Sequence, residues 1–151
     1  MADHVRKQIR ARLLSVLTGL TTTTSNVFAS RVTPLADSEL PAILVDTLES
    51  GEIRAGSAFG PGRLLERSLT VTIGVAVKQT SGYQDTLDQI YKEVEIAIAG
   101  DNTLNGLAKY AQPMAEPAVE LSGEGEKPIA AGRMNYEVVY VTALDAPDVP
   151  R

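Results

Sequence analysis

The stretch from Arg63 to Lys78 (RLLERSLTVTIGVAVK) constrains the fold of this chain more than any other. Its odd positions from 69 to 77 are all apolar, and the even positions between them are small or polar. Because side chains alternate across a β-strand, this period of two predicts a long strand with one apolar face. Each apolar side chain contributes about 1.5–3 kcal/mol when fully buried, whereas ordering each backbone residue costs about 1–2 kcal/mol. The strand therefore needs partner strands beside it and helices over its odd-numbered face: Leu69, Val71, Ile73, Val75 and Val77.

The length and composition predict one globular domain. Hydrophobic residues make up 44 % of the 151 residues and charged residues 22 %, which are ordinary values for a chain that needs no covalent cross-link. The absence of cysteine excludes disulfides and thiolate metal sites. No window approaches 18 apolar residues and no signal-peptide core is present, so we expect a soluble, intracellular origin. We expect a single domain over residues 1–151, compact at about 4–144, with a flexible tail at 145–151.

Apolar residues at helical spacing predict two helices. The first runs from His4 to Leu20 with Asp3 as its N-cap, and the second runs from Tyr83 to Ala99 and ends at a left-handed Gly100. A short helical turn is expected at 102–110. Further strands are predicted at Ser25–Thr33, Pro41–Leu48, Glu52–Arg54, Ala118–Leu121 and Arg133–Leu144.

These elements predict an α+β fold. We expect a single domain with a mainly antiparallel or mixed β-sheet, two main helices packed on one face, and a protruding glycine-rich loop or hairpin. Two segments could supply that protrusion, Gly56–Gly62 and Ser122–Gly132. Both are too long and too rich in glycine for tight hairpin turns. Neither has the spacing of a phosphate-binding loop or lies between a strand and a helix.

Few residues could carry catalysis. The single histidine, His4, lies near a terminus that we expect to fray, and Ser68 and Ser81 have no partner histidine. The acidic residues at 120, 124 and 126 lack the twelve-residue pattern of a calcium loop. The chain has no tryptophan and few other aromatic residues with which to stack a sugar. We therefore expect no enzyme, no cofactor and no metal site.

The charge is unevenly distributed along the chain. Residues 1–36 carry five basic residues and one acidic residue, whereas the remainder carries nine basic and eighteen acidic residues, for a net charge of −5. The basic residues are not interleaved with aromatic ones, and the acidic remainder would repel a phosphate backbone, so specific nucleic-acid recognition is not predicted. Contact with another protein is the alternative, and the candidate interface residues are Phe59, Arg63, Ile96, Glu124 and Glu126.

The order of these elements resembles the tail terminator proteins of tailed bacteriophages, the family that includes the minor tail protein U of lambda-like phages. The resemblance covers about residues 4–144 and lies in the order of the elements and in the residue pattern of the strands. It rests on a basic N-terminal helix, a strand that begins with proline (PAILVDTL), a glycine-rich loop, the long alternating strand (RSLTVTIGVAVK), a helix (YQDTLDQIYKEVEIAIA) and a closing strand (MNYEVVYVT).

The resemblance implies a small domain of which six copies close into a ring on the last ring of the tail tube. The ring stops growth of the tube, fixes the length of the tail and presents a surface to the head. The implied partners are further copies of the chain, the major tail tube protein and a neck or head-completion protein, and DNA passes through the ring. The implied location is the head-proximal end of the virion tail, after assembly in the host cytoplasm. No membrane, cofactor or active site is implied.

Other interpretations remain open at this point. Another head–tail joining or tail-completion protein would share the same small α/β texture. A self-associating bacterial ligand-binding α/β module belongs to a different class, and a small hydrolase is a third possibility. The neighbouring genes discriminate between them, because head-connector and major tail genes would favour the phage interpretation and a metabolic operon would contradict it.

Overall fold

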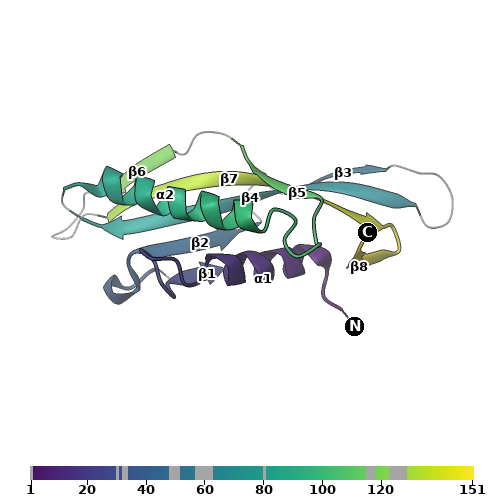
Figure 1. The fold of residues 1–151 in the computed structure, drawn as a ribbon, viewed down its shortest axis with the longest axis horizontal. Helices are drawn as coiled ribbons and strands as arrows, with labels where there is room; N and C mark the ends of the chain where they lie inside the picture. Colours follow the sequence, from purple (N-terminus) through teal and green to yellow (C-terminus); the bar gives the residue numbers. More distant parts are fainter. Residues whose placement is uncertain are drawn as a thin grey trace.

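The computed structural model of the protein describes residues 2–29, 31, 34–47, 52–56, 63–79, 81–114, 118–122 and 129–151, with the backbone alone at 52–56 and 118–122. This part of the chain forms one α+β domain, in which two helices pack on a curled mixed sheet (Figure 1). The predicted fold class is confirmed at this level. The predicted glycine-rich protrusions fall largely on residues 57–62 and 123–128, which lie outside the described residues.

A ribbon of two long antiparallel strands forms the centre of the sheet. Strand β4 (Leu64–Lys78) pairs with β7 (Ile129–Ala143) over the full 15 residues of each strand. At a rise of about 3.3 Å per residue the ribbon is roughly 50 Å long. It runs along the long axis of the molecule (Figure 1).

Two short strands pair with the outer edge of β4. Strand β2 (Ala42–Asp46) lies antiparallel to residues 72–76, and β3 (Glu52–Gly56) lies antiparallel to residues 65–69. A further strand, β1 (Val27–Ala29), extends the sheet by pairing with β2 in parallel. The parallel pair makes the sheet mixed, as the sequence predicted.

Three short strands pair with the outer edge of β7. Strand β6 (Ala118–Ser122) lies opposite residues 129–133, and β5 (Tyr110–Pro113) lies opposite residues 136–139. Strand β8 (Ala146–Pro150) joins after an irregularity in the register at the end of β7. Since β4 and β7 are antiparallel, β3 and β6 lie at opposite ends of the ribbon and on its opposite edges.

The core lies between one face of the ribbon and two helices, α1 (Val5–Leu17) and α2 (Tyr83–Gly100) (Figure 1). The odd-numbered residues of β4 from Leu69 to Val77 are each at most 1 % exposed, which confirms the predicted apolar face. They form one cluster with even-numbered residues of β7 and with the inner faces of both helices. The helix residues in this cluster are Val5, Ile9, Leu13, Leu17, Leu87, Ile90, Tyr91, Val94 and Ile98.

Hydrogen-bonded polar side chains join the strands on the opposite face of the ribbon. Ser68 Oγ donates to Glu137 Oε1 at 2.8 Å, and Gln112 Nε2 donates to Glu137 Oε2 at 2.8 Å. Thr72 Oγ1 donates to Asn135 Oδ1 at 3.1 Å. Cross-strand pairs of this kind each stabilise a sheet by about 0.2–1 kcal/mol.

The start and end of α1 differ from the prediction. The N-cap is His4 and not Asp3, because His4 Nδ1 accepts the backbone N–H of Arg6 at 3.1 Å. The helix ends at Leu17, three residues earlier than predicted, since Gly19 has a φ of 91° that no helix can continue.

The end of α2 also differs from the prediction. Gly100 is the last helical residue and is not left-handed; the positive φ values fall on Leu104, Asn105 and Gly106 in a tight turn that replaces the expected helical turn at 102–110. The side chain of Leu104 is fully buried in the core. Burial of this side chain offsets the strain of a left-handed leucine, and sequence spacing alone does not reveal that balance.

The prediction of a flexible tail at 145–151 is wrong, because Ala146–Pro150 form β8. Gln8 Nε2 donates to the carbonyl of Asp148 at 2.9 Å, which fastens β8 to α1. The two prolines of β8 are tolerated because the strand pairs on one side only within the described residues. Strand β7 likewise begins at Ile129 and not at Arg133, since the ladder with β4 continues that far.

Ile73→Ala tests the burial of the odd-numbered face. Ile73 is fully buried, so we expect the free energy of unfolding in urea to fall by about 2–5 kcal/mol. Ile96→Ala is the matched control, because this isoleucine is 63 % exposed and its loss should change stability by less than about 0.5 kcal/mol. Equal effects of the two substitutions would contradict the assignment of the core.

Tyr91→Phe tests a buried hydroxyl. Tyr91 is 7 % exposed, and its Oη has no hydrogen-bond partner among the described residues. A buried polar group without a partner costs about 1–3 kcal/mol, so its removal should leave the thermal midpoint unchanged or raise it. Tyr140→Phe is the control, because Tyr140 is fully buried and its hydroxyl is not among the buried polar atoms that lack a hydrogen-bond partner, so its removal should destabilise the protein. A clear loss of stability in Tyr91→Phe would show that the hydroxyl is satisfied.

Candidate functional site

The described residues hold no group of three or more His, Asp or Glu side chains that could bind a metal ion. The imidazole of His4 caps α1, so this side chain has a structural contact that the sequence analysis did not anticipate. Within the described part of the chain, the helices are too short or too polar to span a bilayer.

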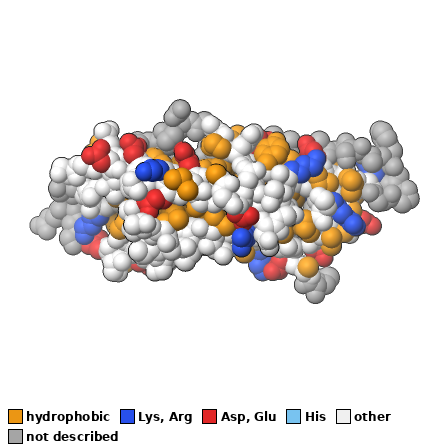
Figure 2. All heavy atoms as spheres, viewed as in Figure 1, with side chains coloured by type: hydrophobic (Ala, Val, Ile, Leu, Met, Phe, Trp, Pro, Cys, Tyr) orange, Lys and Arg blue, Asp and Glu red, His pale blue; other side chains and the backbone are white. Residues whose placement is uncertain are grey.

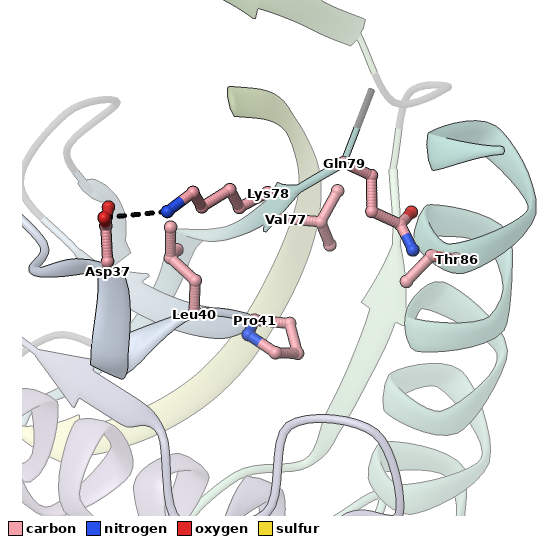
Figure 3. A pocket seen from close by; sticks show the side chains of 7 residues that line it. All are labelled: Asp37, Leu40, Pro41, Val77, Lys78, Gln79 and Thr86. Atoms are coloured by element: carbon pink, nitrogen blue, oxygen red, sulfur yellow. Dashed lines mark ion pairs between the residues drawn. The ribbon is translucent and has the colours of Figure 1, made fainter. Parts of the chain in front are cut away.

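One cleft opens where the end of β4 meets the start of α2 (Figure 3). Its volume is about 220 Å³, below the roughly 300–1,000 Å³ of typical small-molecule pockets. Lys78 Nζ lies 2.7 Å from Asp37 Oδ2, so the amino group that lines the cleft is already in an ion pair. The cleft therefore offers a ligand few free polar groups. Its lining residues are Asp37, Leu40, Pro41, Val77, Lys78, Gln79 and Thr86.

The ends of the ribbon carry strand edges that no described strand covers. Strand β3 pairs only with β4, and β6 pairs only with β7, within the described residues. A free edge exposes N–H and C=O groups that can pair with another chain. Strands β1, β5 and β8 are also paired on one side only within the described residues, but β3 and β6 are the edge strands that lie at opposite ends of the ribbon.

The predicted interface residues do not gather at one place. Phe59, Glu124 and Glu126 lie outside the described residues. Arg63 is half-buried where β4 begins, and its carbonyl accepts the N–H of Leu144 at 2.7 Å. Ile96 lies on the outer face of α2 and is 63 % exposed, as its position on the helix predicted.

The sequence analysis missed several exposed apolar side chains near the edges of the sheet. Met114 follows β5 and is 52 % exposed, while its backbone N–H donates to the carbonyl of Asn135 at 2.8 Å. Leu144 and Val149 are exposed in and beside β8. These residues occupy short segments without a clear period, so only knowledge of the sheet edges could have found them. Apolar side chains are scattered among charged ones on the helix-bearing face (Figure 2).

The two helices carry opposite charge. The thirteen residues of α1 include four basic and no acidic residues, whereas the eighteen of α2 include four acidic residues and one basic residue. Two contacts join the helical layer: Arg12 Nε lies 2.7 Å from Asp101 Oδ2, and Glu93 accepts hydrogen bonds from the N–H and the hydroxyl of Thr22. Arg12 on α1 and Glu93 on α2 thus help to hold α1 and the loop that follows it against α2.

The carboxylate of Asp101 accepts hydrogen bonds from Arg12 and from the backbone N–H of Asn105. Its partial burial favours the neutral form, but the backbone N–H of Asn105 and the guanidinium of Arg12 outweigh burial and lower the pKa of Asp101 below 3.8. The ionised form is therefore the one that stabilises the folded chain.

A comparison of the chain with protein-family models and with curated protein sequences found no match.

Asp101→Asn tests the link between the helices as a function of pH. Because the folded-state pKa of Asp101 is lowered, its contribution is complete above about pH 3.8 and is lost as pH falls through the folded-state pKa. At neutral pH the free energy of unfolding of the variant should be about 0.2–1 kcal/mol lower than that of the parent. This difference should shrink as the pH falls. Asp3→Asn, which removes an exposed pair with Lys7, is the control and should change stability less. A difference that grows as pH falls would contradict this linkage.

Proposed function

We propose that this protein is a structural component of a tailed-bacteriophage virion, a tail terminator of which six copies close into a ring on the tail tube. The ring stops the growth of the tube, fixes its length and offers a surface to the neck or head-completion protein. The order of elements that suggested this family is present in the fold: a basic helix, a strand, a long alternating strand, a helix and a closing long strand. No cofactor belongs to this proposal.

The observation that carries the proposal is the ribbon with a different free edge at each end. A terminator ring has to bind the tube on one side and a neck protein on the other, and these two partners differ. The edge of β3 and the edge of β6 are separated by the length of the ribbon and have different sequences, EIRAG and AVELS. Two such edges fit a protein that bridges two partners.

The groups that would favour another class are engaged in structural contacts. His4 caps a helix, and Lys78 at the small cleft is paired with Asp37. Another head–tail joining or tail-completion protein would use the same two-ended shape. The neighbouring genes and a capping assay distinguish these roles, and a metabolic operon would favour the self-associating ligand-binding module instead.

The state of the purified chain tests the proposal directly. Self-association should rise with protein concentration, and negative-stain images at high concentration should show six-fold rings. The purified chain should also stop the growth of tubes assembled from the major tail tube protein of the same phage. A tight two-fold dimer at every concentration, without an effect on tube growth, would overturn the proposal.

A shortened β6–β7 connection tests one end of the ribbon. Ser122 pairs directly with Ile129, so Asn-Gly in place of residues 123–128 matches the favoured two-residue hairpin. We expect the thermal midpoint to stay within a few degrees of the parent, because the strands are retained, while capping of the tube or attachment of the neck protein is lost.

A matched variant at the other end serves as the control. Shortening the β3–β4 connection at residues 57–62 should impair the activity that the first variant keeps. If the first variant loses capping of the tube, this one should lose attachment of the neck protein, and the reverse. If both shortened proteins cap tubes and bind the neck protein like the parent, the ends of the ribbon are not the contact sites.

A further inference from the structure

The basic residues of α1 divide between two sides of the helix. At about 100° per residue, Arg10 and Arg12 lie roughly 200° apart around the axis. Arg12 reaches Asp101 at the end of α2, whereas Arg10 Nη1 donates to Thr47 Oγ1 at 3.0 Å beyond the end of β2. Arg6 and Lys7 lie on the side of Arg10. We call Arg6, Lys7 and Arg10 the basic flank; it faces away from α2.

The acidic residues of α2 divide in the same way. Glu93 holds Thr22 in the loop that follows α1, so it marks the side of α2 that faces α1. Asp88 and Glu95 lie roughly 140–160° further around the helix. Burial raises the pKa of Tyr136 in β7 to about 12, and the charge of Glu95 adds to the rise, which places Glu95 on the side of β7 and β5. We call Asp88 and Glu95 the acidic flank; the exposed Ile96 lies roughly 80–100° from these two carboxylates, on the outer face of α2 between the flank and Glu93.

These two flanks lie on opposite sides of the helical layer, because α1 and α2 lie side by side on the sheet (Figure 1). Asp88, Glu95 and Ile96 are exposed, and neither carboxylate forms an ion pair with a described residue. On the basic flank, Lys7 is 59 % exposed and Leu14, one turn beyond Arg10, is half-buried. Lys92 lies on α2 one turn after Asp88, and Asp3 pairs with Lys7 beside α1, so the acidic flank keeps an excess of negative charge and the basic flank an excess of positive charge. An apolar side chain lies near each flank, Ile96 on α2 and Leu14 on α1.

Three of the flank charges, those of Arg6, Lys7 and Glu95, lie towards the helix end whose dipole opposes them. Arg6 and Lys7 lie in the first turn of α1, which has no acidic residue, although a helix N-terminus favours negative charge. The last turn of α2 has no basic residue, and Glu95 lies shortly before it, although a helix C-terminus favours positive charge. Local helix stability therefore does not explain these residues.

We propose that the basic flank of one copy docks on the acidic flank of the next copy, so that the helical layer supplies the lateral contact of the proposed ring. The net charges are opposite, and Ile96 of one copy meets the half-buried Leu14 of its neighbour. The contact is heterologous, because each copy uses two different surfaces on opposite sides. Such a contact repeats around a ring and leaves both ends of the β4–β7 ribbon free for other partners. This inference rests on the proposed function for the meaning of the ring, and its geometry rests on the two flanks.

Charge reversal on one flank tests the contact. Arg6→Glu with Lys7→Glu makes both flanks acidic, and Asp88→Lys with Glu95→Lys makes both flanks basic. Arg6→Glu and Lys7→Glu suit the dipole of α1 better but remove the exposed ion pair of Lys7 with Asp3, and Asp88 and Glu95 lie outside the first and last turns of α2. The thermal midpoint should therefore stay close to that of the parent. Self-association measured by sedimentation velocity should nevertheless weaken by about tenfold or more, since like charges then face each other. Asp145→Lys, an exposed reversal away from both flanks, is the control and should assemble like the parent.

Recombining the reversed flanks gives a sharper test. A chain with all four changes has both signs exchanged and should assemble again. An equal mixture of the two reversed proteins should also co-assemble in alternation, although each alone is monomeric. Raised salt should weaken assembly of the parent. Ile96→Asp provides a second variant that does not depend on α1 and should also reduce self-association.

The results separate this inference from the proposed function. Rings that persist in both reversed proteins and in Ile96→Asp would overturn the inference and leave the terminator proposal standing. Failure of the four-fold variant and of the mixture to assemble would also overturn it. Assembly that follows the flank charges while tube growth is unaffected would support the inference and contradict the terminator function. A parent chain that stays monomeric at every concentration would overturn both.

Discussion

The pairing of β4 with β7 is the interaction on which the rest of the structure depends. It fixes the register of 15 residue pairs, and a shift by one residue would turn the apolar face of β4 towards solvent. Strands β2, β3, β5, β6 and β8 each pair with one strand of this ribbon and extend it on either side. The helices then cover the apolar face, and β3 and β6 at the two ends of the ribbon keep one unpaired edge each within the described residues.

Sequence patterns predicted the elements whose signals are local. The period of two in β4 and the helical spacing of α2 gave both elements to within two residues of their observed bounds. The errors arose where contacts distant in the sequence decide the structure. Strand β8 forms because it pairs with β7 and because Gln8 donates a hydrogen bond to it. Its two prolines made the sequence pattern look like a tail and not a strand. The turn after α2 is set by the burial of Leu104, which no local pattern reveals.

The candidate contact surfaces were predictable in part. Ile96 could be identified because an apolar residue opposite the buried stripe of a helix is visible in the spacing alone. The uneven charge of the chain was also visible, but its division into two flanks was not. That division depends on Arg12 reaching Asp101 and on Glu93 holding Thr22, which are contacts between segments far apart in the sequence. The proposed six-copy ring would account for the charge pattern, the exposed isoleucine and the two-ended ribbon together.

The separation of β4 and β7 along the chain has a consequence for biosynthesis. Lys78 pairs with Ile129, so the nascent chain must extend by some fifty residues before the ribbon can begin to form. At about 5–20 residues per second, translation of that interval lasts roughly 3–10 s. During this time one whole edge of β4, rich in valine and threonine, is without its partner and is open to pairing with other nascent chains. In the described part of the folded chain the edges of the sheet are formed by short strands, so the nascent chain passes through a stage with a much longer unpaired edge. Ribosome-associated chaperones would protect the chain most at that stage.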